Sequence, residues 1–449
     1  MDLALLLTWL AFLVVGFVAP FVWGLGYVWV DVLTPHRISY SLLNTLPIAF
    51  ITGAGSLLFY LMLDRKNPPK LTLEHGLIAV LGVWITLTQT WALYPIPAWT
   101  KWDPSFKVLV FTFFIPFLFR SRVQIEAYVL VLIMSAAGHL LPWGLKTLVS
   151  GGGYEQSLGL LGVNASIMSE SSSVAAIAIM FVPLIVWARA HSIIVPRIKL
   201  ASLGFAGLVV VFLVASIGTF ARTGLVGLAI LGSVMFVRSR QKFLFVIAAV
   251  IVGAIMISVT SDRWTERMST ISNVQGETSA YARLFIWKWT LGFVADHPLG
   301  GGFNAYFGNV IVLPPDADGT PNILYGRAFH NIFFAVLGEH GFPGLVIYVS
   351  ILLLALYRMQ RLAKTIRGRP EFNWIYDLAR ASQLSLIIMM ACGNFVDLSF
   401  LFVIWNIIAL MLCLNNHVLQ SLKTTTVRSS TPAVAGPQLA HARLAMSER

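Results

Sequence analysis

The chain has 449 residues, of which 57% are hydrophobic and only 11% are charged, and its mean hydropathy is +0.80. Soluble globular domains carry about 25% charged residues, so this composition excludes an ordinary soluble enzyme. The net charge of +12 does not indicate nucleic-acid binding, because the basic residues form short clusters between apolar runs. The two cysteines, Cys392 and Cys413, lie in apolar segments, which excludes a disulfide framework and a thiolate metal site.

Apolar runs long enough to cross a bilayer occur along most of the chain. The first run contains Pro20, Gly24 and Gly26, and it predicts either one kinked helix or a helix followed by a short re-entrant piece. No Lys or Arg precedes it, so we interpret it as a membrane span and not as a cleaved signal peptide. The sequence thus predicts an all-α polytopic membrane protein with about twelve transmembrane helices, at roughly 3–32, 44–63, 74–94, 104–119, 124–141, 172–188, 198–217, 223–237, 243–259, 329–357, 379–396 and 398–416.

The orientation follows from the basic residues. Of the 31 Lys and Arg residues, 21 lie in one alternating set of connections, which the positive-inside rule assigns to the cytoplasm. Both termini are then cytoplasmic. One large loop, 260–328, lies between spans 9 and 10 on the outward side. Residues 1–422 form the predicted transmembrane domain, and the Ser-, Thr-, Pro- and Ala-rich segment 423–449 is a predicted disordered cytoplasmic tail.

The large loop contains several local signals. The stretch Ser279–Val294 is rich in aromatic residues and predicts a helix lying partly at the membrane surface. The run Gly300–Gly302 and the prolines Pro314 and Pro315 predict turns after it. Asp316-Ala-Asp318 resembles the acidic pair of metal-dependent sugar transferases, but the surrounding residues favour a turn. The sequence therefore indicates no metal site and no cofactor.

Three basic residues of the predicted outer side are candidates for binding a phosphate group. Arg222 lies among the small residues of Gly218–Gly224, which allow an anionic group to approach the guanidinium. Arg283 and Lys288 lie on the predicted loop helix, and a diphosphate is best held by charged groups from two sides. Each residue also fits an ordinary cation whose side chain reaches the membrane surface.

His330 and Asn331 begin the tenth predicted span. An imidazole titrates near neutral pH, so His330 could accept a proton from a sugar hydroxyl, although a hydrogen-bonded structural role also fits. Glu339 follows nine residues later, about 13 Å along a continuous helix, so it could meet His330 only where Gly341 and Pro343 break that helix.

These motifs resemble a known family in their order and spacing. Residues 200–416 resemble the O-antigen ligase/polymerase superfamily, and the N-terminal segment, with Pro35–Asn44, resembles O-glycosylation ligases associated with exosortase systems. The first resemblance rests on Ala221–Gly224 around Arg222, on Arg283 with Trp287 and His297–Phe303, and on His330-Asn331 with Gly338–Leu345.

The resemblance implies a metal-independent, inverting glycosyltransferase of the bacterial inner membrane that acts on the periplasmic face. Its donor would be a glycan on undecaprenyl diphosphate, and its acceptor would be lipid A-core, a glycoprotein or another glycan. Arg222 and Arg283 would hold the diphosphate, with Lys288 as a further candidate from its position. His330 would orient or deprotonate the acceptor hydroxyl. The resemblance implies no role for Glu339 or His340.

Other functions remain open from the sequence. A polymerase would use the same donor as a ligase. A transporter of lipid-linked oligosaccharides would also have many spans, but transporters place their charges near mid-membrane, whereas these charges lie outside. An acid such as Asp31 would serve as the base in another class of membrane transferase, and a structural partner of a polysaccharide export machine is a further alternative.

Overall fold

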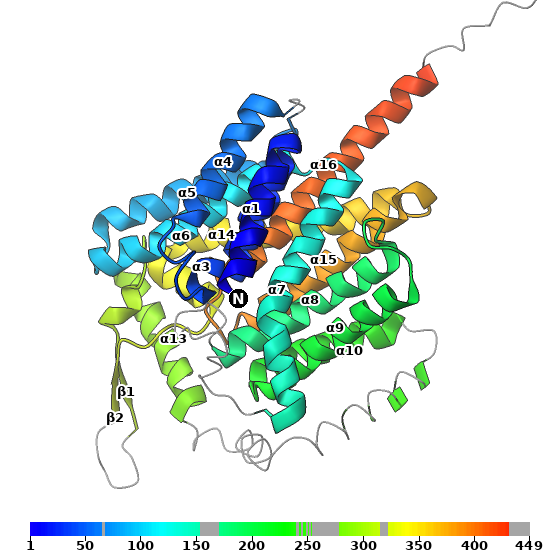
Figure 1. Cartoon of the computed structure of the whole chain (residues 1–449). Coiled ribbons are helices and arrows are strands. Elements are labelled where there is room, and N and C mark those ends of the chain that lie inside the picture. The colour runs from blue at the N-terminus through cyan, green and yellow to red at the C-terminus, as the bar shows by residue number, and fades with distance from the viewer. Residues whose placement is uncertain are drawn as a thin grey trace, which may run out of the picture.

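The computed structural model describes residues 1–64, 68–152, 170–238, 278–314 and 322–430, together with a few residues between 242 and 253. The described chain is a helical bundle with one short hairpin of strands, which confirms the predicted helical class (Figure 1). The N-terminal helices are α1 (Asp2–Val18), α2 (Phe21–Leu33), α3 (Pro35–Ile38), α4 (Ile48–Leu63), α5 (Leu73–Leu87), η1 (Thr88–Trp91), α6 (Pro95–Leu118) and α7 (Arg122–Ser150). The remaining elements are α8 (Ser171–His191), α9 (Lys199–Gly218), α10 (Arg222–Arg238), α13 (Thr278–Asp296), η5 (Ala305–Gly308), β1 (Val310–Leu313), β2 (Asn322–Tyr325), α14 (Ile332–Ile366), η6 (Pro370–Phe372), α15 (Asn373–Cys392) and α16 (Phe402–Ser430).

Six of the described helices are long and apolar enough to cross a bilayer: α7, α8, α9, α14, α15 with η6, and α16. The chain is therefore a multi-pass membrane protein. The predicted spans from 44–63 onward coincide with α4 to α16 to within several residues at most ends. The exception is 243–259, most of which lies outside the described residues. The total of twelve spans and the orientation in the membrane stay predictions.

The first apolar run forms two separate helices, α1 and α2, and not one kinked helix. It breaks at Ala19 and Pro20, and α1 and α2 pack against each other as an antiparallel pair. Proline has no N–H to continue the helical ladder, which explains a break at this position. The carboxylate of Asp2 accepts hydrogen bonds from Ser39 Oγ at 2.9 Å and from the backbone N–H of Ser41 at 2.8 Å. The first residues thus lie beside the loop that follows α2.

The connections predicted to be cytoplasmic meet at one end of the bundle, which we call the basic end. Here Arg120 binds Asp64 at 2.7 Å, and the Arg120 carbonyl lies 2.7 Å from His417 Nδ1 on α16. Asp64 ends α4 at this end, so the loop before α4, with Asp2 beside it, lies at the opposite end. The first residues and the described end of α16 thus lie at opposite ends of the bundle, because the α1–α2 hairpin adds a turn inside the first apolar run. The side of the membrane that each terminus faces stays a prediction.

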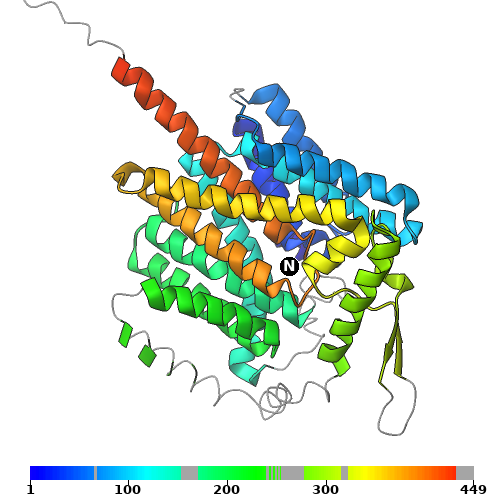
Figure 2. The same cartoon turned by 180° about the vertical axis from the view of Figure 1, so that it is seen from behind.

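The opposite end, which we call the loop end, carries α13 and the β1–β2 hairpin (Figure 1). The strands are antiparallel, with Val310 opposite Tyr325. Helix α13 confirms the helix predicted over 279–294. Figure 2 shows α14 and α15 running side by side from this end towards the basic end, where α16 extends past them. Helix α16 continues to Ser430, into the predicted tail, and 431–449 lie outside the described residues.

Candidate functional site

The start of α14 is tied to the end of α15. Asn331 caps α14, because its Oδ1 accepts hydrogen bonds from the N–H groups of Phe333 and Phe334 at 2.8 and 3.2 Å. The next amide, of Ile332, donates to the carbonyl of Gly393 at 2.8 Å. His330 precedes the cap in a left-handed conformation, with φ of 49°. The cap thus fixes the backbone from which the His330 side chain leaves the helix.

Helix α13 packs against this helix start. Its buried residues Ala282 and Ile286 form a small apolar cluster with Phe329. Trp287 donates from Nε1 to the Phe329 carbonyl at 3.0 Å, and its ring stacks on Phe334 with 5.2 Å between the centroids. These contacts hold the intervening residue of α13, Arg283, beside His330.

Two acidic residues complete the group. Glu170 directly precedes α8, and its Oε1 lies 3.9 Å from His330 Nδ1. Asp397 lies in the loop between α15 and α16, near enough for its charge to act on both His330 and Glu170. Arg283 acts on the same two residues. We call Glu170, Arg283, His330 and Asp397 the charged cluster. Glu170 directly precedes α8, whereas the other three residues come from the segment 278–430.

The charged cluster favours a neutral imidazole. Burial lowers the pKa of His330 below its ordinary value of 6.5, and the charge of Arg283 lowers it further, against the opposing effect of Asp397. Burial raises the pKa of Glu170, while Arg283 acts in the opposite direction. The side chains of His330 and Glu170 are 35% and 45% exposed, so water and a hydroxyl group can reach them. At neutral pH His330 is therefore available as a proton acceptor beside a guanidinium.

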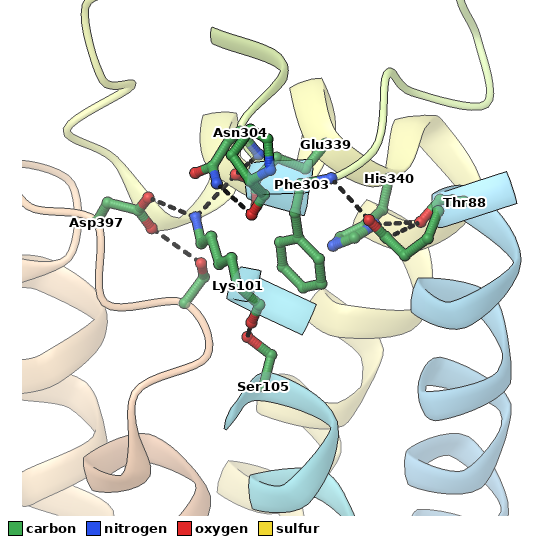
Figure 3. A network of polar contacts seen from close by, with 11 residues as sticks. Thr88, Lys101, Ser105, Phe303, Asn304, Glu339, His340 and Asp397 are labelled. Carbon is green, nitrogen blue, oxygen red and sulfur yellow. Dashed lines mark hydrogen bonds and ion pairs between the residues drawn. The ribbon is translucent and has the colours of Figure 1, made fainter. Parts of the chain in front are cut away.

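A second polar network lies against the cluster and shares Asp397 with it (Figure 3). Lys101, on α6, binds Glu339 Oε1 at 2.8 Å and Asp397 Oδ2 at 3.3 Å. The backbone N–H of Asn304 donates to the same oxygen of Glu339 at 3.0 Å. Burial lowers the pKa of Lys101, but Asp397 and Glu339 outweigh burial and hold it above its ordinary value. Lys101 thus stays charged and anchors the Asp397 loop to α6 and α14.

The break in α14 explains how Glu339 reaches Lys101. Gly341 has φ of 67° and ψ of −168°, so the helix is interrupted there, as Gly341 and Pro343 predict. The carbonyls of Gly338 and Glu339 accept hydrogen bonds from the amides of Gly301 and Gly302 at 3.0 and 2.9 Å. The triple-glycine turn therefore satisfies backbone groups near the break, and Glu339 pairs with Lys101, not with His330.

The other predicted phosphate-binding residues are less closely placed. Arg222 is the first residue of α10 and is half-buried. The carbonyl of the following residue, Thr223, lies 3.5 Å from the thiol of Cys392, the last residue of α15. Helix α10 therefore begins beside the end of α15, to which the start of α14 is also tied. Arg222 is thus at the same end of the bundle as the charged cluster. Lys288 is exposed, and five residues place it about 140° around α13 from Arg283, so it faces another direction.

Sequence reasoning missed Glu170 and Asp397, and it assigned no role to Lys101. An acid directly before an apolar run, such as Glu170 before Ser171, was a usable signal. Asp316 and Asp318 lie outside the described residues. Within the described ranges, no group of three His, Cys, Asp or Glu side chains is placed to hold a metal ion.

Comparison with protein families agrees with the position of this site. Residues 207–349, which contain Arg222, Arg283, His330 and Glu339, match the family described as O-antigen ligase. This part of the chain is thus similar to the O-antigen ligase superfamily. Residues 1–193 match a family of unknown function, so the resemblance of this segment to exosortase-associated ligases stays a prediction. A search of curated proteins finds no match to the chain.

Similarity of this segment to the O-antigen ligase family indicates an enzyme that transfers glycosyl groups. The charged cluster draws on both matched segments, because Glu170 lies in the first and Arg283 with His330 in the second. Lys101 and Glu339 are divided between the segments in the same way. Both segments therefore build the candidate site.

Proposed function

We propose that this protein transfers a glycan from undecaprenyl diphosphate to an acceptor hydroxyl at the loop end of the bundle, which we assign to the periplasmic face. The acceptor is lipid A-core or a protein hydroxyl. The single observation that carries the proposal is that His330, a neutral imidazole, lies near enough to Arg283 for the guanidinium charge to act on it. The reaction needs both a proton acceptor and a positive charge for a diphosphate leaving group.

The proposed reaction is one displacement. The acceptor oxygen attacks the anomeric carbon, the bond from that carbon to the diphosphate oxygen breaks, and the configuration inverts. His330 takes the hydroxyl proton. Arg283 and Arg222 bind the diphosphate and stabilise the charge that develops on it. No metal ion or cofactor takes part in this mechanism.

Glu170 has a supporting role in this proposal. Its carboxylate faces His330 Nδ1 at 3.9 Å, which is longer than a hydrogen bond and can shorten when substrate binds. A carboxylate on Nδ1 would leave Nε2 to accept the proton of the acceptor, and it would stabilise the imidazolium that forms. Glu170 is thus a positioning residue for His330.

Purified protein supplied with an undecaprenyl-diphosphate-linked glycan, with and without an acceptor, tests the function. A glycan–acceptor product that appears only when lipid A-core or protein is added is the result that we expect. Lengthening of the lipid-linked glycan alone would identify a polymerase with the same donor. Movement of the donor across a bilayer without a new glycosidic bond would identify a transporter and contradict the proposal.

A further inference from the structure

Two apolar grooves flank a pair of arginines at the basic end of the bundle, far from the charged cluster. One groove, with a volume of about 410 Å³, lies between α8, α10 and α15 and includes Val186 and Met235. The other, of about 460 Å³, is lined by residues of α10, α14 and α15 that include Val237 and Ile387. Each volume falls in the range of small-ligand sites, roughly 300–1,000 Å³.

The two grooves share the same polar residues. Arg238, the last residue of α10, and Arg380, in the second turn of α15, line both grooves, and their positive charges lie close enough to repel each other. Arg380 Nη1 donates to Gln360 Oε1 and Gln383 Oε1, both at 2.7 Å, which fixes its guanidinium. Leu384 lies between the grooves and lines both.

Carboxylates do not neutralise this pair directly. In the described part of the chain, neither Arg238 nor Arg380 lies within ion-pair distance of an acidic side chain. Asp377 lines one groove and its charge acts on Arg238, but its Oδ2 is held at 2.6 Å by His191 Nε2. Two neighbouring guanidiniums without an ion-pair partner are a favourable site for a phosphate, which guanidinium groups bind with paired hydrogen bonds.

The walls of the grooves are apolar and reach the surface. Val186, Met235, Val237 and Ile387 are 44%, 39%, 74% and 40% exposed. Val186 and Ile387 lie on α8 and α15, which are long and apolar enough to cross a bilayer, and the other two lie on α10, a span predicted from the sequence. Such side chains contact lipid tails readily. Basic pockets between helices at the polar surface of a membrane bind the head groups of anionic lipids.

We infer that Arg238, Arg380 and the two flanking grooves form a binding site for an anionic diacyl phospholipid. The phosphate lies between the two guanidiniums, and one acyl chain occupies each groove. The lipid bridges α8, α10, α14 and α15 at the end of the bundle opposite the charged cluster. This site is independent of the proposed glycan transfer, because it requires none of the residues of that reaction.

Native mass spectrometry of the full chain, titrated with phosphatidylglycerol or with phosphatidylcholine, tests the inference. We expect one phosphatidylglycerol to bind with preference over phosphatidylcholine. Replacing both arginines (R238Q with R380Q) should weaken phosphatidylglycerol binding roughly 10- to 30-fold, since each basic residue near a membrane surface contributes a factor of about five. The matched control, R361Q with R367Q, removes two exposed arginines near the same end and should keep the affinity.

A second variant separates the site from folding defects. L384W keeps both arginines and fills the space between the grooves, so it should also weaken phosphatidylglycerol binding. Soluble glycerol phosphate should not compete, because it lacks the acyl chains. The inference would be overturned if the wild type, the R238Q/R380Q variant and L384W bound phosphatidylglycerol equally well. It would also be overturned if the wild type bound phosphatidylcholine as tightly as phosphatidylglycerol, or if glycerol phosphate competed fully.

Discussion

Lys101 and Glu339 form an ion pair at 2.8 Å that joins the two family-matched segments of the chain. The carboxylate of Glu339 is fully buried, whereas Lys101 keeps 26% of its side chain exposed. Through Asp397 the same lysine contacts the loop that contributes to the charged cluster. The pair therefore connects the break in α14 to the candidate site, and the N-terminal segment takes part in building that site.

Removing one partner of this pair should destabilise the protein. Lys101→Met leaves a buried carboxylate without its counter-charge, and we expect a loss of about 3 kcal/mol, seen as a lower thermal midpoint in detergent. Adding Glu339→Gln to Lys101→Met should restore part of the loss. Lys107→Met removes an exposed pair with Asp103 and should cost less than about 1 kcal/mol. Equal effects of Lys101→Met and Lys107→Met would contradict the structural role of the pair.

Arg283 should be essential for transfer. Arg283→Ala removes a positive charge from the proposed diphosphate site, and the rate should fall by at least about 100-fold, as when one stabiliser of a leaving group is lost. Arg283→Lys should recover only part of the rate, because Lys lacks the planar fork of Arg. Lys288→Ala, on another face of α13, is the control and should keep most of the activity. The readout is the glycan–acceptor product per minute at equal amounts of folded protein.

The pH dependence should follow His330. The mechanism needs the neutral imidazole, so the rate should fall as the pH drops through the pKa of His330, which burial and Arg283 hold below 6.5. The exposed Arg327 also lowers this pKa. Arg327→Gln should therefore move the acid limb of the pH–rate profile to higher pH and leave the rate at pH 8 unchanged. An acid limb that stays in place in Arg327→Gln would show that another group titrates.

Gly341 should tolerate no side chain. Its positive φ is unfavourable for other residues, and an added Cβ would lie 2.2 Å from the carbonyl oxygen of Pro298. We expect Gly341→Ala to cost about 3 kcal/mol and to lower both thermal stability and activity. Gly292→Ala, on an open face of α13, is the control and should be neutral or slightly stabilising. A fully stable Gly341→Ala would contradict the observed break in α14.

Chelation of divalent metals should leave transfer intact. The proposed mechanism uses Arg222 and Arg283 where metal-dependent transferases use a divalent ion. EDTA at millimolar concentration should therefore not change the initial rate. A strict requirement for added Mg²⁺ or Mn²⁺ would favour a different class of membrane transferase, one in which an acid such as Asp31 serves as the base.

The sequence predicted most helices because, within the described residues, each apolar run from 44–63 onward corresponds to a long helix. For the first run it left open one kinked helix or a helix followed by a short re-entrant piece, and Pro20 lies at the turn between α1 and α2. Periodicity does not report such a turn, because both helices are apolar on most faces.

The candidate site was predictable only in part. Arg222, Arg283 and His330 were identified by residue type and by motif spacing, and the structure brings Arg283 close to His330. Glu170 and Asp397 were missed because their relation to His330 depends on how α8, α15 and α16 pack, which local sequence does not encode. The pairing of Glu339 with Lys101 spans 238 residues and required the same tertiary information.

Binding of the donor, measured separately from transfer, tests the central claim most directly. Purified wild-type protein, Arg283→Ala and His330→Ala would each be titrated with an undecaprenyl-diphosphate-linked glycan and then given acceptor. We predict that His330→Ala binds the donor as tightly as wild type but does not transfer the glycan, whereas Arg283→Ala loses donor affinity. Transfer by His330→Ala at the wild-type rate, or undiminished donor binding by Arg283→Ala, would contradict the assignment of these two residues.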